Sequence, residues 1–264
     1  METAPRSIAA ANRLPEAAKE KLYGSIFPPA LLERFHIHPS KFCDDHGNSL
    51  LTLNGSAASA SVEIDLRPSP GFPDPLVYAH LADTMNNQII VLLFVVNDPA
   101  SPRFDVDRLP DGTKTQFGTL ARNVPAEMAA LEAGLAPGQV RRGLRILKDA
   151  ICAFEGFISA FGREMYFVEP LTYHNAIAFE RYGFAYQQGK RWMESLNTRF
   201  APGGDIVARL DGSTPFRRPG AERSIRGRSW AIHDGILGEP YTGVHMYKMA
   251  GKMAGAATYP DAVW

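Results

Sequence analysis

Alternating and continuous apolar runs in the first half of the chain predict β-strands. Residues 61–67 alternate one by one, so that Val62, Ile64 and Leu66 fall on one face, as in a strand with one solvated face. The run Ile89–Val96 is apolar throughout, which predicts a central strand covered on both faces. Further short strands are expected at residues 49–53, 77–81 and 165–168.

The middle of the chain has helical periodicity. Apolar residues recur every three or four positions, which predicts a long helix over about residues 140–161 with one buried stripe. The stripe comprises Leu144, Leu147, Ile151, Phe154, Ile158 and Phe161. Asn123 is placed to cap an earlier helix that ends at Gly134. Shorter helices are expected at residues 16–23, 30–35 and 172–182, and a late strand at residues 206–210.

These elements predict an α+β fold, in which helices flank a mixed, mostly antiparallel sheet. The sequence contains no internal repeat and no low-complexity linker, so its 264 residues are interpreted as a single domain. A β-rich part is expected over about residues 1–110, a core over about residues 85–215 and a C-terminal extension over residues 216–264.

Composition narrows the function classes. Lys and Arg together number 28, as do Asp and Glu, so the zero net charge argues against a DNA-binding protein. The longest apolar run has eight residues, far short of the ~20 that a membrane span needs. The N-terminus lacks the pattern of a secretory signal, and two distant cysteines, Cys43 and Cys152, fit a reducing compartment. We therefore expect a cytoplasmic protein.

Residues 138–184 carry a resemblance to a known family. A turn, a long helix, a strand, a short helix and a final Gly-Phe follow one another, as in the second half of the GNAT acyltransferase superfamily. Residues 138–144 read Gly-Gln-Val-Arg-Arg-Gly-Leu, which is similar to the loop with which that family wraps the pyrophosphate of CoA. Residues 176–184 read Ala-Ile-Ala-Phe-Glu-Arg-Tyr-Gly-Phe, similar to the end of the family's next helix. The resemblance implies an acyl-CoA N-acyltransferase-like fold.

The resemblance also implies a set of CoA-binding residues, with acyl-CoA as the co-substrate. A helix N-terminus binds anions through its free backbone N–H groups, and neighbouring arginines add positive charge. Gly143 lies one position later than the corresponding glycine of the family, and Asn175 lies three positions after the family's CoA-contacting asparagine. The expected CoA-binding residues are Gly138, Gln139, Arg141, Arg142, Gly143 and Asn175.

Acyl transfer needs a base for the acceptor and an acid for the leaving thiolate. Glu169, at the end of the predicted strand 165–168, is the expected base. Phe179 stands where the family commonly has its tyrosine acid, so Tyr173 or Tyr182 is expected to supply the proton instead. The acceptor is a small amine or hydroxyl compound under this hypothesis.

A second hypothesis is a zinc or iron enzyme. Two histidines at positions i and i+2 of a strand share a face, and a nearby Cys-x-x-His pair completes a tetrahedral set. The residues concerned are His36, His38, Cys43 and His46, for which a polar surface loop is the alternative. His174 with Glu155, Glu169 and Glu180 is a further possible ligand set.

Three other features of the sequence leave alternatives open. Five arginines at 217, 218, 223, 226 and 228 either clamp a phosphorylated or carboxylate ligand or form a solvated loop. Met246, Met249 and Met253 indicate soft packing or an interface, for which a homodimer is one alternative. The missing tyrosine at Phe179 also supports a third hypothesis, a ligand-binding protein without catalysis on a degenerate acyltransferase fold.

Overall fold

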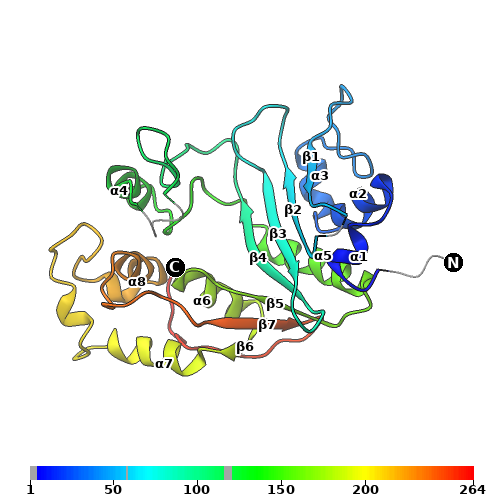
Figure 1. Ribbon diagram of the computed structural model, residues 1–264. Coiled ribbons are helices and arrows are strands. Elements are labelled where there is room, and N and C mark those ends of the chain that lie inside the picture. The colour runs from blue at the N-terminus through cyan, green and yellow to red at the C-terminus, as the bar shows by residue number, and fades with distance from the viewer. Residues whose placement is uncertain (1–4, 58, 116–120) are drawn as a thin grey trace. The chain divides into compact units, whose positions relative to one another are not determined.

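The computed structural model of the protein describes residues 5–57, 59–115 and 121–264 (Figure 1). Over these residues the chain is an α+β protein, with seven strands in one mixed, mostly antiparallel open sheet and eight α-helices. The prediction of an α+β fold with a mixed, mostly antiparallel sheet is confirmed at this level.

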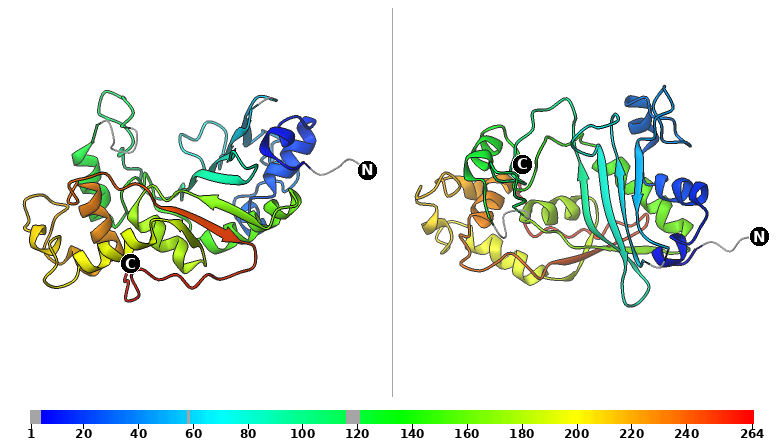
Figure 2. Two further views of the ribbon diagram at one scale, coloured as in Figure 1. Left: turned by 60° about the horizontal axis from the view of Figure 1, so that its bottom comes forward. Right: turned by 45° about the horizontal axis from the view of Figure 1, so that its top comes forward.

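The sheet has the strand order β1-β2-β3-β4-β5-β7-β6. Strands β1 to β4 pair antiparallel, each with the next, and lie side by side in Figure 2. Strand β4 pairs parallel with β5. A parallel pair needs a crossover connection, and helix α5 lies within it. The strands are β1 Leu51–Asn54, β2 Ser61–Leu66, β3 Val77–Asp83, β4 Ile89–Val96, β5 Met165–Val168, β6 Ala185–Gln188 and β7 His245–Met249.

Four of the eight helices described, α2, α3, α4 and α6, lie within one or two residues of their predicted bounds, whereas α1, α7 and α8 are not predicted. The side chain of Asn123 accepts a hydrogen bond from the backbone N–H of Ala126, so the predicted cap of α4 is confirmed. Gly183, at φ 81°, follows α6 as the predicted stop signal. The helices are α1 Ile8–Ala11, α2 Glu16–Gly24, α3 Pro29–Arg34, α4 Val124–Glu132, α5 Leu147–Ala160, α6 Tyr173–Arg181, α7 Lys190–Arg199 and α8 Ile225–His233.

The chain divides into two compact units, and each unit is built from three separate stretches of sequence. Unit 1 comprises residues 1–100, 143–169 and 247–252. Unit 2 comprises residues 101–142, 170–246 and 253–264. The last short stretch of unit 1 is tied to α5, because Lys248 Nζ lies 3.5 Å from a carboxylate oxygen of Glu155.

The core of unit 1 is built from the two apolar faces that the sequence predicts. Val62, Ile64 and Leu66 of β2 are buried, so the expected alternation is confirmed. The helical stripe is confirmed over α5, where Phe154 packs edge-on against Tyr166 of β5 with ring centroids 4.8 Å apart. Burial of aromatic side chains of this size is the main stabilising term for such a core.

The start of α5 differs from the prediction. The helix begins at Leu147 rather than at residue 140. Two backbone features prevent helix before that point. The carbonyl of Val140 accepts a hydrogen bond from the N–H of Phe104, and Arg145 has φ 60°, which lies in the left-handed region and cannot continue a right-handed helix. Leu144 is buried all the same, outside the helix.

The burial of β4 also differs from the prediction. Only Ile89 is buried, and the seven residues 90–96 that follow are half-buried although all of them are apolar. The prediction of a strand covered on both faces is therefore wrong for most of β4. A continuous apolar run shows that a strand is suited to an apolar environment, but it does not show what supplies that environment.

The core of unit 2 lies around Trp230 of α8. Its ring stacks on Phe216 at a centroid distance of 5.1 Å, and its Nε1–H donates to the carbonyl of Leu135 at 2.8 Å. The expected late strand at residues 206–210 is wrong, because Val207–Arg209 form a 3-10 turn. That turn is held by a hydrogen bond from the N–H of Arg209 to the carbonyl of Ile206.

Helix length and composition bear on membrane association. Over the described ranges, none of the helices combines the length and the apolar character that a bilayer crossing requires.

A glycine in α5 gives a test of this packing. Gly156→Ala is expected to raise the free energy of unfolding by about 0.5–1 kcal/mol, because Ala loses less backbone entropy in a helix. Gly156 is exposed, and a Cβ there meets no atom within 4 Å. Urea unfolding of both proteins measures the difference.

Gly24→Ala is the contrasting variant, because its Cβ would lie 2.0 Å from Cζ of the buried Phe42 ring. It is expected to destabilise the protein. Equal effects of the two substitutions would contradict the packing described for unit 1.

Candidate functional site

Strand β4 separates from its parallel neighbour after three residue pairs. Residues 89–91 pair with residues 166–168 of β5, and within the described residues the pairing on this side ends there. Residues 92–96 continue as an apolar, half-buried strand. At about 3.3 Å per residue, the stretch from Val91 to Val96 is about 16 Å long. Unit 1 therefore has a long apolar strand edge whose backbone N–H and C=O groups lack a strand partner on this side.

Glu169 lies at one end of this edge. It directly follows Val168, which is paired with Val91, so it stands where β4 continues without β5. Its side chain is half-buried. The prediction of Glu169 at a strand end is confirmed, and its location at the point of separation is new information from the structure.

Gly143 lies at the other end of the same edge. A Cβ added to Gly143 would lie 3.5 Å from the carbonyl oxygen of Val96, the last residue of β4. Gly143 itself is exposed, and α5 begins four residues later without a side-chain cap at Ile146. Unit 1 thus brings the expected phosphate-binding glycine and the expected base to opposite ends of one apolar strand edge.

The other residues of the expected CoA loop, 138–142, belong to unit 2. Gln139 accepts a hydrogen bond from the N–H of Ala136 at 2.7 Å, which fixes the turn before it. Arg141 is buried and donates to the carbonyl of Ser101, so its guanidinium is already engaged by the protein. Arg142 is exposed and donates to the carbonyl of Ala133 at 3.0 Å.

Helix α6 carries the two tyrosines expected as acids. Tyr173 is buried, and its hydroxyl accepts a hydrogen bond from Arg228 at 3.4 Å. Burial raises the pKa of Tyr173 to about 12. Tyr182 follows the helix and is half-buried. Asn175, the expected asparagine, is half-buried in the first turn of α6.

The residues expected to bind a metal ion lie in turns and loops of unit 1 rather than in a strand. His36, at φ 52°, His38 and His46 are exposed, while Cys43 is half-buried. Nδ1 of His38 accepts hydrogen bonds from the backbone N–H groups of Ser40 and Lys41. Among the residues with described positions, no group of three His, Cys, Asp or Glu side chains is arranged to hold a metal ion.

His174 and the carboxylates expected beside it have separate partners. His174 is buried, with Nδ1 2.9 Å from Ser229 Oγ, and burial lowers its pKa to about 3. His174 is therefore neutral at physiological pH. Glu180 is also buried and accepts hydrogen bonds from Thr258 and Tyr186. These polar groups are used to join α6 to other parts of unit 2.

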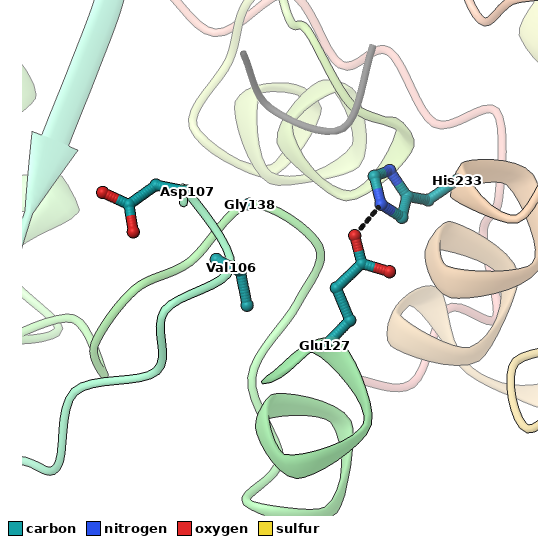
Figure 3. A pocket seen from close by; sticks show the side chains of 5 residues that line it. All are labelled: Val106, Asp107, Glu127, Gly138 and His233. Carbon is teal, nitrogen blue, oxygen red and sulfur yellow. Dashed lines mark hydrogen bonds and ion pairs between the residues drawn. The ribbon is translucent and has the colours of Figure 1, made fainter. Parts of the chain in front are cut away.

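A small pocket in unit 2 holds a pair of groups that the sequence does not reveal (Figure 3). Glu127 of α4 and His233 of α8 point toward each other, with Oε1 2.9 Å from Nε2. The pocket has a volume of about 10 Å³, room for about one water molecule, and Val106, Asp107 and Gly138 complete its lining. Glu127 and His233 are 106 positions apart in the sequence, so no local pattern connects them.

Arg122 extends this pair into a charged network. Its Nε donates to Oε2 of Glu127 at 2.9 Å, and its Nη1 donates to Asp234 at 2.8 Å. Asp234 also accepts from Nε of Arg217 at 2.9 Å. Burial by itself raises the pKa of Glu127, but the hydrogen bonds from His233 and Arg122 outweigh it and lower the pKa overall. Glu127 is therefore an ionised carboxylate, so Nε2 of His233 must donate to it.

The network makes stability depend on pH. Glu127→Gln is expected to cost about 2 kcal/mol of unfolding free energy at pH 7, because it removes the charge that the half-buried side chains of Arg122 and His233 contact. Because the pKa of Glu127 is lower in the folded state, its charge stabilises the fold above the unfolded-state pKa of about 4.3. This stabilisation is lost as the pH falls through the folded-state pKa. Urea unfolding of both proteins at pH 7, 5 and 3 measures this.

The difference in unfolding free energy between the wild type and Glu127→Gln should therefore shrink below about pH 4. Glu132→Gln, at an exposed position of the same helix, is the control and should change stability little. A gap that stays constant from pH 7 to pH 3 would show that the charge of Glu127 is not what stabilises unit 2.

Comparisons with known proteins were made at three levels. Family models, curated proteins and solved structures give no match to this chain. A proposal about its function therefore rests on its own residues and their geometry.

Proposed function

We propose that this protein transfers an acyl group from acyl-CoA to a small amine or hydroxyl acceptor. The observation that carries the proposal is the half-buried apolar edge of β4 beyond Val91, which has no strand partner on the β5 side among the described residues. Glu169 lies at one end of this edge and Gly143 at the other. The resemblance of residues 138–184 to the GNAT superfamily supports the same function. So does the order α5, β5, α6 and Gly-Phe along the chain.

The edge of β4 suits the arm that links the phosphates of CoA to its thioester. This arm is a long chain with two amide groups, so it needs both apolar contact and backbone hydrogen bonds. An unpaired strand edge supplies both, as in other cases where an extended ligand is added beside a strand. Its length of about 16 Å is enough to lay out most of such an arm.

The two ends of this edge differ in chemistry, and this difference sets the direction in which CoA lies along β4. Phosphates need exposed glycine backbone and positive charge, which Gly143 and the adjacent Arg142 provide. The thioester then lies toward Glu169 at the separation of β4 and β5. The CoA-binding role of Gly138, Gln139, Arg141 and Asn175 remains part of the proposal, although Gln139 and Arg141 act mainly by shaping the loop.

In this reaction Glu169 takes a proton from the acceptor while its nitrogen or oxygen attacks the thioester carbonyl. The new C–N or C–O bond forms, the C–S bond breaks, and the leaving thiolate receives a proton. Of the two tyrosines expected as the acid, both in unit 2, Tyr182 is the one that the proposal retains. It is half-buried, whereas Tyr173 is buried with its hydroxyl bonded to Arg228 and its pKa is raised to about 12.

Phe179 favours a second candidate function, ligand binding without catalysis. It stands where a tyrosine acid is expected from the resemblance, and its ring packs on Phe184 at a centroid distance of 4.8 Å. A binding protein of this kind would hold acyl-CoA on the same strand edge and release it unchanged. Turnover in the presence of an acceptor distinguishes the two functions.

Calorimetric titration with acetyl-CoA tests the binding step. Gly143→Ala is expected to weaken binding about tenfold, because its methyl group adds bulk where phosphate approaches the backbone. The fold should tolerate the change, since the added Cβ makes only an ordinary contact with Val96. Gly156→Ala, on the exposed face of α5, is the matched control and should bind as the wild type does. Folded wild-type protein that binds no acetyl-CoA would rule out the proposed function.

Steady-state acyl transfer tests the assigned groups, once an acceptor screen has supplied an acceptor. Glu169→Gln is expected to lower kcat by about 10²-fold or more without weakening acetyl-CoA binding, because only proton transfer is lost. Tyr182→Phe should also lower kcat, and Tyr173→Phe should have the smaller effect. A loss confined to Tyr173→Phe would contradict the choice of Tyr182 as the acid.

A further inference from the structure

The structure separates the five clustered arginines of the C-terminal third. Arg217 pairs with a carboxylate at the end of α8, and Arg223 pairs with its neighbour Glu222. Arg228 is buried, with its guanidinium 3.6 Å from the centre of an aromatic ring. Within the described part of the chain, Arg226 has neither a carboxylate partner nor an aromatic ring against its guanidinium. Arg218 is exposed. The predicted clamp therefore reduces to the question of what Arg226 binds.

Arg226 is held near the end of α4 with an unsatisfied donor. Its Nε is buried and has no hydrogen-bond acceptor among the described residues. Its Nη1 lies 3.3 Å from the position that a Cβ of Gly134 would occupy. A buried donor without an acceptor costs free energy, so a group that satisfies it is to be expected.

Arg142 brings a second positive charge to the same turn. Its Nη2 donates to the carbonyl of Ala133, the residue before Gly134. Burial and the charge of Arg142 both lower the pKa of Arg226, so the two guanidinium groups are close enough to repel each other. Neither arginine takes part in an ion pair with any described carboxylate. The C-terminal end of α4 offers only a partial negative charge in compensation.

We propose that Arg142 and Arg226 together bind a phosphate oxyanion. Two planar guanidinium groups present forked donors that match the oxygens of a phosphate, and their charges match its one or two negative charges. A bound phosphate accepts from the Nη groups of the two arginines and replaces repulsion between them by attraction to a shared ligand. Both arginines belong to unit 2, so the site is complete within that unit.

This site does not depend on acyl transfer. The phosphate has two possible sources, a phosphate group of CoA, because Arg142 directly precedes Gly143, or a separate phosphorylated ligand. Both sources use the same donors. The experiment therefore begins with inorganic pyrophosphate alone and uses CoA only as a competitor.

Calorimetric titration of the full chain with pyrophosphate tests the site. Arg226→Met and Arg142→Met are each expected to weaken binding about tenfold or more, since each removes charge-assisted hydrogen bonds. Methionine keeps much of the apolar length of the arginine side chain. Arg218→Met is the matched control. Arg218 is exposed on the same segment. The variant should therefore bind pyrophosphate as the wild type does. An equal loss in Arg218→Met, or full binding in Arg226→Met, would overturn the proposal.

Thermal unfolding in phosphate-free buffer separates a binding role from a structural one. Arg226→Met should unfold at the same temperature as the wild type or higher, because the substitution removes an unsatisfied donor and a repulsive charge. Pyrophosphate should raise the unfolding temperature of the wild type and not that of the variant. A variant that unfolds well below the wild type without any phosphate would show that Arg226 is structural and would overturn the site.

Competition identifies the source of the phosphate. Displacement of pyrophosphate by CoA, but not by pantetheine, assigns the oxyanion to CoA and supports both proposals. Binding of pyrophosphate that CoA does not displace assigns the site to a separate phosphorylated ligand. That outcome supports the site and leaves the acyltransferase proposal to the acetyl-CoA titration.

Discussion

The short parallel pairing between β4 and β5 is the constraint on which the proposed site depends. Three residue pairs join the strands, and β4, still paired with β3, then continues without a described strand partner on its other side. If the pairing had continued in the same register, β5 would cover this edge, and Glu169 would be paired opposite Leu92. The early separation instead leaves an apolar strand with a carboxylate at one end and an exposed glycine at the other. The early separation of β4 and β5 thus creates both the exposed strand edge and the proposed position of the reacting groups.

Unit 2 is organised by charge as well as by apolar packing. Glu127 lies in the first turn of α4, where its negative charge complements the helix dipole, and it pairs with His233 in the last turn of α8. At the other end of α4, Arg142 and Arg226 gather near the carbonyl end of the helix. The negative end of that dipole favours them but leaves most of their charge uncompensated. The charges at the N-terminal end of α4 are therefore paired, whereas the two arginines near its C-terminal end suit the binding of an anion.

Local patterns in the sequence identify most elements but not their surroundings. Strand β4 is predicted with its observed bounds, and its half-exposed state is missed because periodicity does not reveal the neighbouring elements. The start of α5 is missed because Arg145 adopts a left-handed conformation that favours glycine, and nothing in its side chain signals this.

The candidate site residues also divide into those that a local sequence pattern predicts and those that only the fold brings together. Glu169 is a candidate because it follows a predicted strand, and Gly143 is one because its loop resembles the CoA-binding loop of the GNAT superfamily. The pairs Glu127–His233 and Arg142–Arg226 join residues about a hundred and about eighty positions apart, and only the fold brings them together. The expected metal ligands fail to gather because the chain around His36 and His38 turns instead of extending.

The interleaving of the two units has a consequence for biosynthesis. Unit 1 receives its last stretch, residues 247–252, only after nearly all of unit 2 has been made, and unit 2 ends with residues 253–264. During translation neither unit can complete its contacts before residues 247–264 have been made. Contacts between such distant parts of the sequence form slowly, so the nascent chain exposes apolar strands such as β4 for most of its synthesis. Chaperone dependence during expression, and intolerance of C-terminal truncation, follow from this chain order.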